Sequence, residues 1–358
     1  MRSVRCPVVR VVLVAVLAVL PGSVSAAQIS PAPGSVPLLA MKGSAYGPLA
    51  LGGGFLVFAR SNGQQNATST VVEQRSLQTG RTRRLASDSL PLYGLASTSD
   101  WVVYAAQASR GIALVAVRHD RTRRLVLTRS LLAPLAARGD RIAWAEGVDV
   151  RQRVLVRNMR TGRTWVAADL PRCLGGRCYR IDFVTLADDG VAFDRGAVGP
   201  QASYVVRRRF DGPVEPALVR NDPQPDLVPS SSGALYYAYG RGWMRWDFGQ
   251  KRPRLARIAG VPRTQVLALD RGRLLLFTGD RCRAKLVIDR PAGASLVYSS
   301  PVSSPLATHA FGPLCASLTG FVLDKSHLTT AWALIPDTSI QAHSDVGLVG
   351  LIVRRKLP

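Results

Sequence analysis

Lysine is almost absent from this chain of 358 residues: 5 of its 47 basic residues are lysine and 42 are arginine. With 23 acidic residues, the formal net charge is +24. Such a charge could indicate a polyanion as partner, either nucleic acid or an anionic envelope polymer. The arginines are scattered through the whole chain, however, and no recognition helix or aromatic-basic module accompanies them. The composition therefore does not predict a specific nucleic-acid ligand.

Common catalytic and metal-binding motifs are missing as well. The four histidines show no metal-ligand spacing such as His-x-x-x-His, and there is no Gly-x-Ser-x-Gly nucleophile elbow. Most acidic residues that follow or precede strand-like runs occupy turn positions. We therefore expect no cofactor and no metal.

Only one apolar run is long, and it lies near the N-terminus. Residues 11–20 follow the positive residues Arg2, Arg5 and Arg10, and small residues precede Ala26. Ten helical residues span about 15 Å, which is half of a hydrocarbon core. The pattern predicts a secretory signal peptide over residues 1–26, cleaved after Ala26, with an uncleaved anchor as the alternative. We expect a secreted or extracytoplasmic protein, monomeric and without a later membrane span.

A hairpin motif recurs along the rest of the chain. Residues 76–86 read as a turn followed by an extended strand, and residues 118–125 and 158–165 repeat the pattern. Copies at intervals of about forty residues indicate a repeat architecture.

A second periodic feature is a short apolar run with a central aromatic residue. It occurs seven times, separated by 40 to 55 residues, which is close to the length of one four-stranded propeller blade. After a linker at residues 27–35, we predict an all-β, seven-bladed β-propeller over residues 36–358, with six or eight blades as alternatives. The aromatic residues are Phe58, Tyr104, Trp144, Phe193, Tyr237, Phe277 and Trp332.

The two ends of the chain complement each other. The seventh unit has a second strand around Trp332 and a third at residues 349–354, but no fourth. A spare strand, residues 36–41, precedes the first unit. We predict that this N-terminal strand pairs into the seventh unit and closes the ring, which removes exposed sheet edges.

The hairpin resembles the "strand, D-x-x-T-G, strand" element of TolB/WD40-like β-propellers, here at residues 77–80. The resemblance covers residues 36–358 as architecture. The His and Trp-Asp signatures of WD40 repeats and the Pro-Asp-Gly of TolB blades are missing. The resemblance implies a scaffold that binds proteins. It assigns no catalytic residue to this chain.

Four cysteines follow the signal: Cys173, Cys178, Cys282 and Cys315. Spacing alone allows three pairings. In a propeller all four would lie on one face, which holds the loops from second to third strands and from one blade to the next. The first two cysteines would lie a third of the ring away from the other two, which is too far for a bridge, so we predict Cys173–Cys178 and Cys282–Cys315. A zinc site with four converging ligands is the rival interpretation.

Asp194 is the most unusual side chain. It follows Phe193, where five other units have alanine and one has threonine. A carboxylate at such a position needs a partner, and Arg195 is adjacent. Either the strand ends one residue early, which we favour, or the carboxylate faces the central cavity.

These features predict an exported, non-enzymatic propeller that binds a protein or an anionic envelope polymer through the cysteine-bearing face. The alternative is a propeller hydrolase or lyase acting on carbohydrate, which requires Asp194 to converge with other acids. The candidate contact residues at the loop ends are Arg60, Glu146, Asp194, Arg195, Arg241, Asp280 and Arg281.

Overall fold

In the computed structural model, described from Ser35 to Lys356, every element is a β-strand. The description omits residues 43, 63–69, 89–91, 119–120, 175, 198–202, 220–226, 229–233, 240–241, 248–249, 257–264, 271–272, 279–284, 291–292, 300–313, 324–326 and 337–348. The N-terminal residues 1–34, with the predicted signal peptide and most of the predicted linker, lie outside the described residues.

The described strands form seven antiparallel sheets, numbered here in chain order. The first three sheets contain β2 (Ser44–Gly52), β3 (Phe55–Asn62), β4 (Thr70–Ser76) and β5 (Thr82–Asp88); β6 (Leu92–Ser97), β7 (Val102–Ala108), β8 (Gly111–Arg118) and β9 (Arg121–Thr128); and β10 (Ala136–Arg138), β11 (Arg141–Val148), β12 (Arg151–Asn158) and β13 (Thr164–Pro171). The fourth contains β14 (Cys173–Leu174), β15 (Arg177–Arg180), β16 (Val184–Leu186), β17 (Gly190–Ala197), β18 (Ser203–Arg209) and β19 (Val214–Val219).

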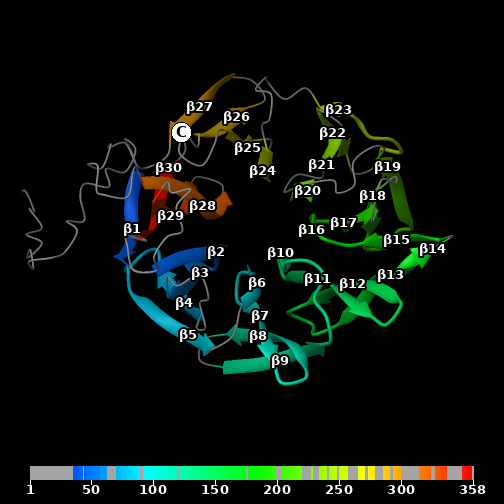
Figure 1. Ribbon diagram of the computed structural model, residues 1–358, viewed down its shortest axis with the longest axis horizontal. Helices are drawn as coiled ribbons and strands as arrows, with labels where there is room; N and C mark the ends of the chain where they lie inside the picture. Colours follow the sequence, from blue (N-terminus) through cyan, green and yellow to red (C-terminus); the bar gives the residue numbers. More distant parts are fainter. Residues whose placement is uncertain are drawn as a thin grey trace, which may run out of the picture.

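The last three sheets contain β20 (Leu227–Val228), β21 (Ala234–Tyr239), β22 (Gly242–Asp247) and β23 (Arg254–Ala256); β24 (Gln265–Asp270), β25 (Arg273–Thr278), β26 (Lys285–Arg290) and β27 (Gly293–Ser299); and β28 (Leu314–Leu323), β29 (His327–Pro336) and β30 (Val349–Lys356) with β1 (Ser35–Lys42). The sheets surround a common centre as the blades of a propeller (Figure 1). The predicted all-β propeller fold is confirmed.

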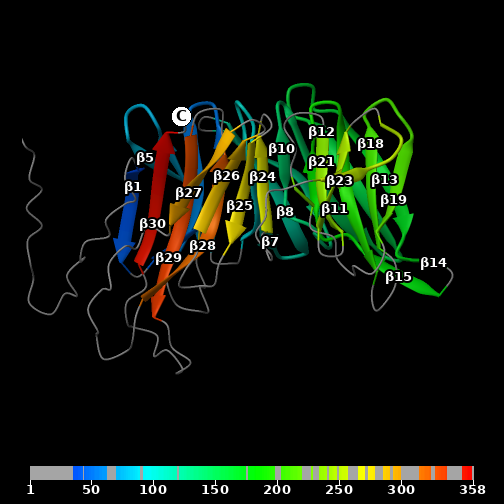
Figure 2. The same cartoon turned by 90° about the horizontal axis from the view of Figure 1, so that it is seen from above.

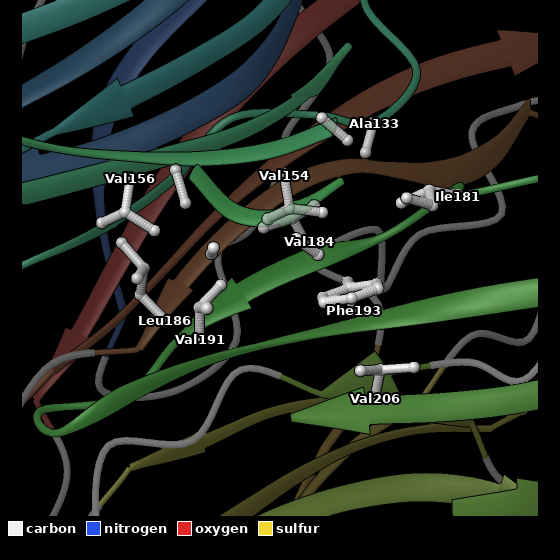
Figure 3. Close-up of a cluster of buried hydrophobic side chains, with 13 residues drawn as sticks. Ala133, Val154, Val156, Ile181, Val184, Leu186, Val191, Phe193 and Val206 are labelled. Atoms are coloured by element: carbon white, nitrogen blue, oxygen red, sulfur yellow. The ribbon is translucent and has the colours of Figure 1, made fainter. Parts of the chain in front are cut away.

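The core lies between neighbouring sheets. Figure 3 shows one such layer, in which Val154 and Val156 of the third sheet meet Leu186, Val191 and Phe193 of the fourth. Similar clusters join the first sheet to the second and the second to the third. Strands covered on both faces should be apolar throughout rather than alternating, and β7 begins with five consecutive buried residues. The apolar runs of the sequence therefore arise from double-sided burial.

The predicted aromatic positions all fall on the second strand of their sheets, from β3 to β29. Phe58, Trp144 and Phe193 are completely buried, and Tyr104 and Tyr237 are nearly so. An aromatic side chain at this place fills the space between two sheets, because it buries more area than any aliphatic one.

The repeated hairpin has the same turn in the first and third sheets. Gly80 and Gly162 adopt φ angles of 71° and 76°, which favour glycine. The amide of each glycine donates to the carbonyl of the residue four positions earlier, Ser76 or Asn158, at 3.0 and 2.8 Å. The side-chain oxygens of Ser76 and Asn158 in turn accept a hydrogen bond from the threonine amide of the turn. The hairpin is thus a structural module of the sheets.

The two chain ends meet in one sheet. Strand β1 pairs antiparallel with β30 from Ser35↔Arg355 to Lys42↔Val349, and the two lie side by side in Figures 1 and 2. The seventh sheet also packs on the first, through Tyr46, Phe58, Ala331 and Ile352. The predicted pairing of the N-terminal strand is confirmed, with the strand starting at Ser35, one residue before the predicted boundary.

Two arginines join the fourth sheet to its neighbours. Arg207 is buried, stacks 3.9 Å from the Trp246 ring centroid and donates to the carbonyl of Asp247 at 2.8 Å. Arg208 donates to the carbonyl of Ala167 in β13 at 2.7 Å. Because buried charges must be paired or hydrogen-bonded, these guanidinium groups hold sheets together rather than face a ligand.

We expect deletion of residues 35–42 to lower the free energy of unfolding by roughly 3 kcal/mol or more, because the strand's leucines pack between sheets and a buried leucine contributes about 1.5–3 kcal/mol. Leu38 and Leu39 both pack on the cluster between the first and seventh sheets. Urea denaturation measures the change. A truncation that ends at residue 34 is the matched control and should be neutral. Equal stability of both truncations would contradict the closing role of β1.

Candidate functional site: a basic pocket beside a disulfide hairpin

A short hairpin projects from the fourth sheet. Strands β14 and β15 pair through Cys173↔Cys178, and these two cysteines form a disulfide. The hairpin lies at one edge of the ring, at the end of the molecule where β29 also ends (Figure 2). This end carries the turns from second to third strands, such as that between β11 and β12, so it is the cysteine-bearing face predicted from the sequence.

A pocket of about 460 Å³ lies between this hairpin and the third sheet. It is formed by the connection from β9 to β10, the turn from β11 to β12 and the inner side of the hairpin. The lining residues are Arg129, Ser130, Leu132, Gly147, Asp149, Arg151, Gln152, Arg172, Tyr179 and Arg180. Four arginines and one aspartate give this lining a strong positive charge.

Three of the four arginines are paired with carboxylates. Arg129 lies 3.3 Å from Asp149, with both side chains mostly exposed, at 82% and 73%. Arg151 lies 2.6 Å from Asp169, and its hydrogen bond is the main cause that lowers the pKa of the Asp169 carboxyl. Exposed pairs of this kind contribute at most about 1 kcal/mol to stability, so a ligand carboxylate can compete for these guanidinium groups.

The remaining arginine, Arg172, has no side-chain partner among the described residues. Its backbone is nevertheless fixed: its amide donates to the carbonyl of Val150 at 2.7 Å, and its carbonyl accepts from the amide of Tyr179 at 2.8 Å. Arg172 is an exposed residue of the pocket lining. An unpaired cation on a fixed backbone is suited to binding an anion.

The floor of the pocket is held by a buried polar contact and a stacked cation. The Gln152 side chain donates to the carbonyl of Tyr179 at 2.7 Å. Behind Tyr179, Arg195 stacks 4.3 Å from the ring centroid and donates to the carbonyl of Pro171 at 2.9 Å. Burial lowers the pKa of the Arg195 guanidinium. Arg195 therefore positions the hairpin from behind and does not face the pocket opening.

Two exposed aliphatic residues, here called the apolar rim, adjoin the pocket lining along the chain: Val150 lies between the lining residues Asp149 and Arg151, and Leu174 follows the lining residue Arg172 by two positions. Val150, at the turn from β11 to β12, is 75% exposed, and Leu174, in β14, is 61% exposed. Asp149, beside Val150, has a φ of 53°, a conformation that non-glycine residues seldom adopt. Arginine is enriched at protein–protein interfaces, and exposed aliphatic side chains beside it offer apolar area that a partner can bury.

Asp194 serves the same hairpin from inside the sheet. Its Oδ1 accepts hydrogen bonds from the amides of Asp182 and Phe183, at 2.9 and 2.7 Å. These two residues lie between β15 and β16, which both pair with β17. The carboxylate thus takes the place of ladder hydrogen bonds where the first strand of this sheet is interrupted.

The favoured interpretation of Asp194 as the end of a strand is therefore wrong. Strand β17 continues to Ala197, and Asp194 is completely buried, opposite Val205. Its carboxylate forms no ion pair with Arg195 among the described residues, because the two side chains point to opposite sides of the strand. Burial raises the pKa of Asp194 to about 7, although its backbone hydrogen bonds oppose the rise.

Two other predicted contact residues, Arg60 and Glu146, are not among the residues that line the pocket. Arg60 lies in β3 and pairs with Glu73 of β4 at 3.2 Å, half-buried. Glu146 is buried in β11, next to the pocket residue Gly147. Arg241, Asp280, Arg281 and Cys282 lie outside the described residues. The prediction of a Cys282–Cys315 disulfide is thus not tested, and Cys315 is in β28, not in the predicted inter-blade loop.

Sequence reasoning missed the pocket arginines. Arg129, Arg151, Arg172 and Arg180 are four of 42 arginines, and no local pattern separates them from the arginines that join sheets. The usable signal was the Cys-x-x-x-x-Cys insertion at residues 173–178, which marks the hairpin that forms one wall.

The described residues contain neither a cluster of three potential metal ligands nor a helix that could cross a lipid bilayer. The catalytic alternative requires acids that converge on an open cavity. Within the described part of the chain, Asp194 is enclosed, and Asp149 and Asp169 are paired with arginines.

Comparison with known proteins gives the fold. No family model and no curated protein sequence matches the chain. Among solved structures, a prolyl endopeptidase matches at a TM-score of 0.58 and 16% identity, over 81% of this chain and 45% of its own length. The chain thus spans less than half of that enzyme. A polysaccharide lyase matches at a TM-score of 0.54 and 7% identity, over 86% of this chain and 89% of its own.

The β-propeller domain of the Trilobed protease from Pyrococcus furiosus matches at a TM-score of 0.56 and 9% identity, over 81% of this chain and 89% of its own. That domain is described as having an open velcro topology, whereas β1 and β30 pair here. TolB from Acinetobacter baumannii is also among the matches, at a TM-score of 0.41 and 12% identity, over 80% and 76% of the two chains. The match to the Pyrococcus furiosus domain supports the β-propeller architecture that the sequence predicted.

We expect a Cys173→Ser/Cys178→Ser variant to remain folded but to loosen its hairpin. The disulfide closes a short loop, so its loss should cost about 2 kcal/mol or less in global stability. Hydrogen exchange should accelerate at the amides of residues 172–180, and amides of β7 should keep their protection as an internal control. Unchanged exchange in the hairpin would show that the disulfide does not hold the pocket wall.

We expect the stability of the protein to fall relative to an Asp194→Asn variant as pH rises from 4 to 7. The folded-state pKa of about 7 lies above the ordinary value of 3.8, so folding binds a proton in this window and deprotonation weakens the native state. The difference is at most a few kcal/mol, since one pKa unit corresponds to about 1.4 kcal/mol.

Urea denaturation of both proteins at several pH values measures this difference. The amide oxygen of asparagine can still accept the two backbone hydrogen bonds, so any cost of the new NH₂ group is independent of pH. A stability difference between the two proteins that stays constant from pH 4 to pH 8 would refute the raised pKa.

Proposed function

We propose that this chain is an exported, seven-bladed β-propeller that acts as a non-enzymatic scaffold, binding a protein or an envelope polymer through the face that carries the β14–β15 hairpin. The observation that carries the proposal is the pocket beside that hairpin, with its excess of arginine and its exposed Val150 and Leu174. Loops at strand ends are where propellers can vary their surface without disturbing the packed sheets.

Several observations support the individual parts of this proposal. Seven sheets among the described residues, with β1 completing the last, support the blade number and the closed ring. A disulfide between Cys173 and Cys178 supports export, because disulfides persist in oxidising compartments. The four arginines against one aspartate in the pocket lining support an anionic partner.

The catalytic alternative, a hydrolase or lyase acting on carbohydrate, has weaker support. The likeness to a polysaccharide lyase concerns the fold alone, at 7% identity. Asp194, which that alternative needed in an open cavity, accepts backbone hydrogen bonds in the sheet interior. Incubating the protein with acidic polysaccharides and measuring new reducing or unsaturated sugar ends tests this alternative. Steady product formation would contradict the scaffold proposal and support the catalytic alternative.

We expect the tagged protein to capture a specific partner from an envelope fraction of its own cells, and an Arg129→Glu/Arg180→Glu variant to lose that partner. Both side chains line the pocket and are exposed, so charge reversal should repel an anionic partner without unfolding the protein. The matched control is Arg163→Glu, in the exposed turn at the opposite end of β12. Capture that survives the pocket variant, or fails for all proteins, would contradict binding through this face.

A further inference from the structure

The pocket can be assigned a more specific ligand from its charge pattern. Arg172, which has no side-chain partner among the described residues, is an exposed residue of the pocket lining, and the Arg129–Asp149 pair is exposed to solvent. A guanidinium presents a planar pair of donors that matches a carboxylate. The strongest new contact available to a ligand is therefore a carboxylate on Arg172, and Arg129 and Arg180 in the same lining offer further donors.

The apolar rim determines what else the ligand carries. The carbonyl of Val150 accepts a hydrogen bond from the amide of Arg172 at 2.7 Å, and Leu174 follows Arg172 by two residues, so both exposed aliphatic residues belong to the segments that carry the pocket arginines. A ligand that covers these side chains gains their burial, about 25 cal/mol per Å² of apolar area. Aliphatic groups next to carboxylates are a property of acidic peptide segments.

A carbohydrate ligand fits this rim less well. Sugar rings pack on the faces of exposed aromatic side chains, and the pocket's aromatic residue, Tyr179, is buried with Arg195 stacked on its ring. A sugar presents mainly hydroxyl groups, which would not bury the apolar surface of Val150 and Leu174. The observations therefore favour a protein over an acidic polysaccharide.

The pocket is also pre-organised. The disulfide, the Gln152 contact and the Arg195 contacts hold the hairpin in place before any ligand arrives. A rigid site avoids part of the entropy cost of ordering a loop on binding. A short segment of a few residues can then bind with measurable affinity.

We propose that the pocket recognises an acidic segment of a protein partner, with an Asp or Glu carboxylate on Arg172 and a neighbouring aliphatic side chain on Val150 and Leu174. This proposal rests on the proposed function and narrows its partner to a protein with an exposed segment of this kind.

Selection from a displayed library of random heptapeptides on the purified protein tests it. We expect the selected peptides to be enriched in Asp or Glu next to Leu, Ile or Val. Measured by fluorescence anisotropy, synthetic copies of these peptides should lose about tenfold in affinity when their acidic residues are replaced by the corresponding amides. The unchanged peptides should lose a similar factor in affinity for the Arg172→Ala and the Val150→Ser/Leu174→Ser proteins. Arg163→Ala, on the opposite face, should change nothing.

Selected peptides without acidic enrichment, no selected peptides, or binding that is equal for Arg172→Ala and Arg163→Ala would overturn the proposal. Oligogalacturonate that binds through Arg172 when no peptide does would overturn the choice of a protein ligand but keep the scaffold function. Envelope capture that depends on Arg129 and Arg180 but not on Arg172, Val150 and Leu174 would overturn the assigned contacts and keep the scaffold function. The two proposals therefore fail separately.

Discussion

Each sheet of this protein has two apolar faces, and only its neighbours can cover them. Strand β7 is buried over five consecutive residues, and the equivalent strands β11 and β17 are buried in the same way. No sheet can be stable alone under this constraint, so the sheets need a ring of neighbours, and the ring needs its ends joined. The pairing of β1 with β30 and the packing of the seventh sheet on the first satisfy that need. Binding residues are therefore expected in the loops at the strand ends, because these loops can change without exposing the apolar faces of the sheets.

The fourth sheet shows how an insertion is accommodated within that constraint. Its first strand is interrupted between β15 and β16, and the interruption leaves the amides of Asp182 and Phe183 without ladder partners. Asp194 accepts both, at the cost of burying a carboxyl group whose pKa rises to about 7. The acid that looked like a candidate catalytic group and the cysteine pair that looked like a separate feature are therefore parts of one arrangement, which builds the pocket wall.

Much of the architecture could be predicted because short sequence patterns recur from one sheet to another. The aromatic of the second strand and the glycine of the hairpin turn each recur at blade spacing, and each has one physical role. The partners of Asp194 could not be predicted, because they are backbone amides eleven and twelve residues earlier in the chain and no side-chain pattern encodes them. Arg60 was chosen as a contact for its loop-end position, but Glu73 on the adjacent strand neutralises it.

The arginine content illustrates why total charge is a poor guide to a binding site. Arg207 and Arg208 are consumed in joining sheets, and Arg138 pairs with Asp188 of the neighbouring sheet at 2.8 Å. Among the four arginines of the pocket lining, Arg172 alone has no side-chain partner among the described residues, and its backbone is fixed by two hydrogen bonds. Exposed arginines elsewhere, such as Arg163, share both properties, so the position of Arg172 in a pocket lining, and not its charge alone, makes it the candidate contact for an anionic ligand.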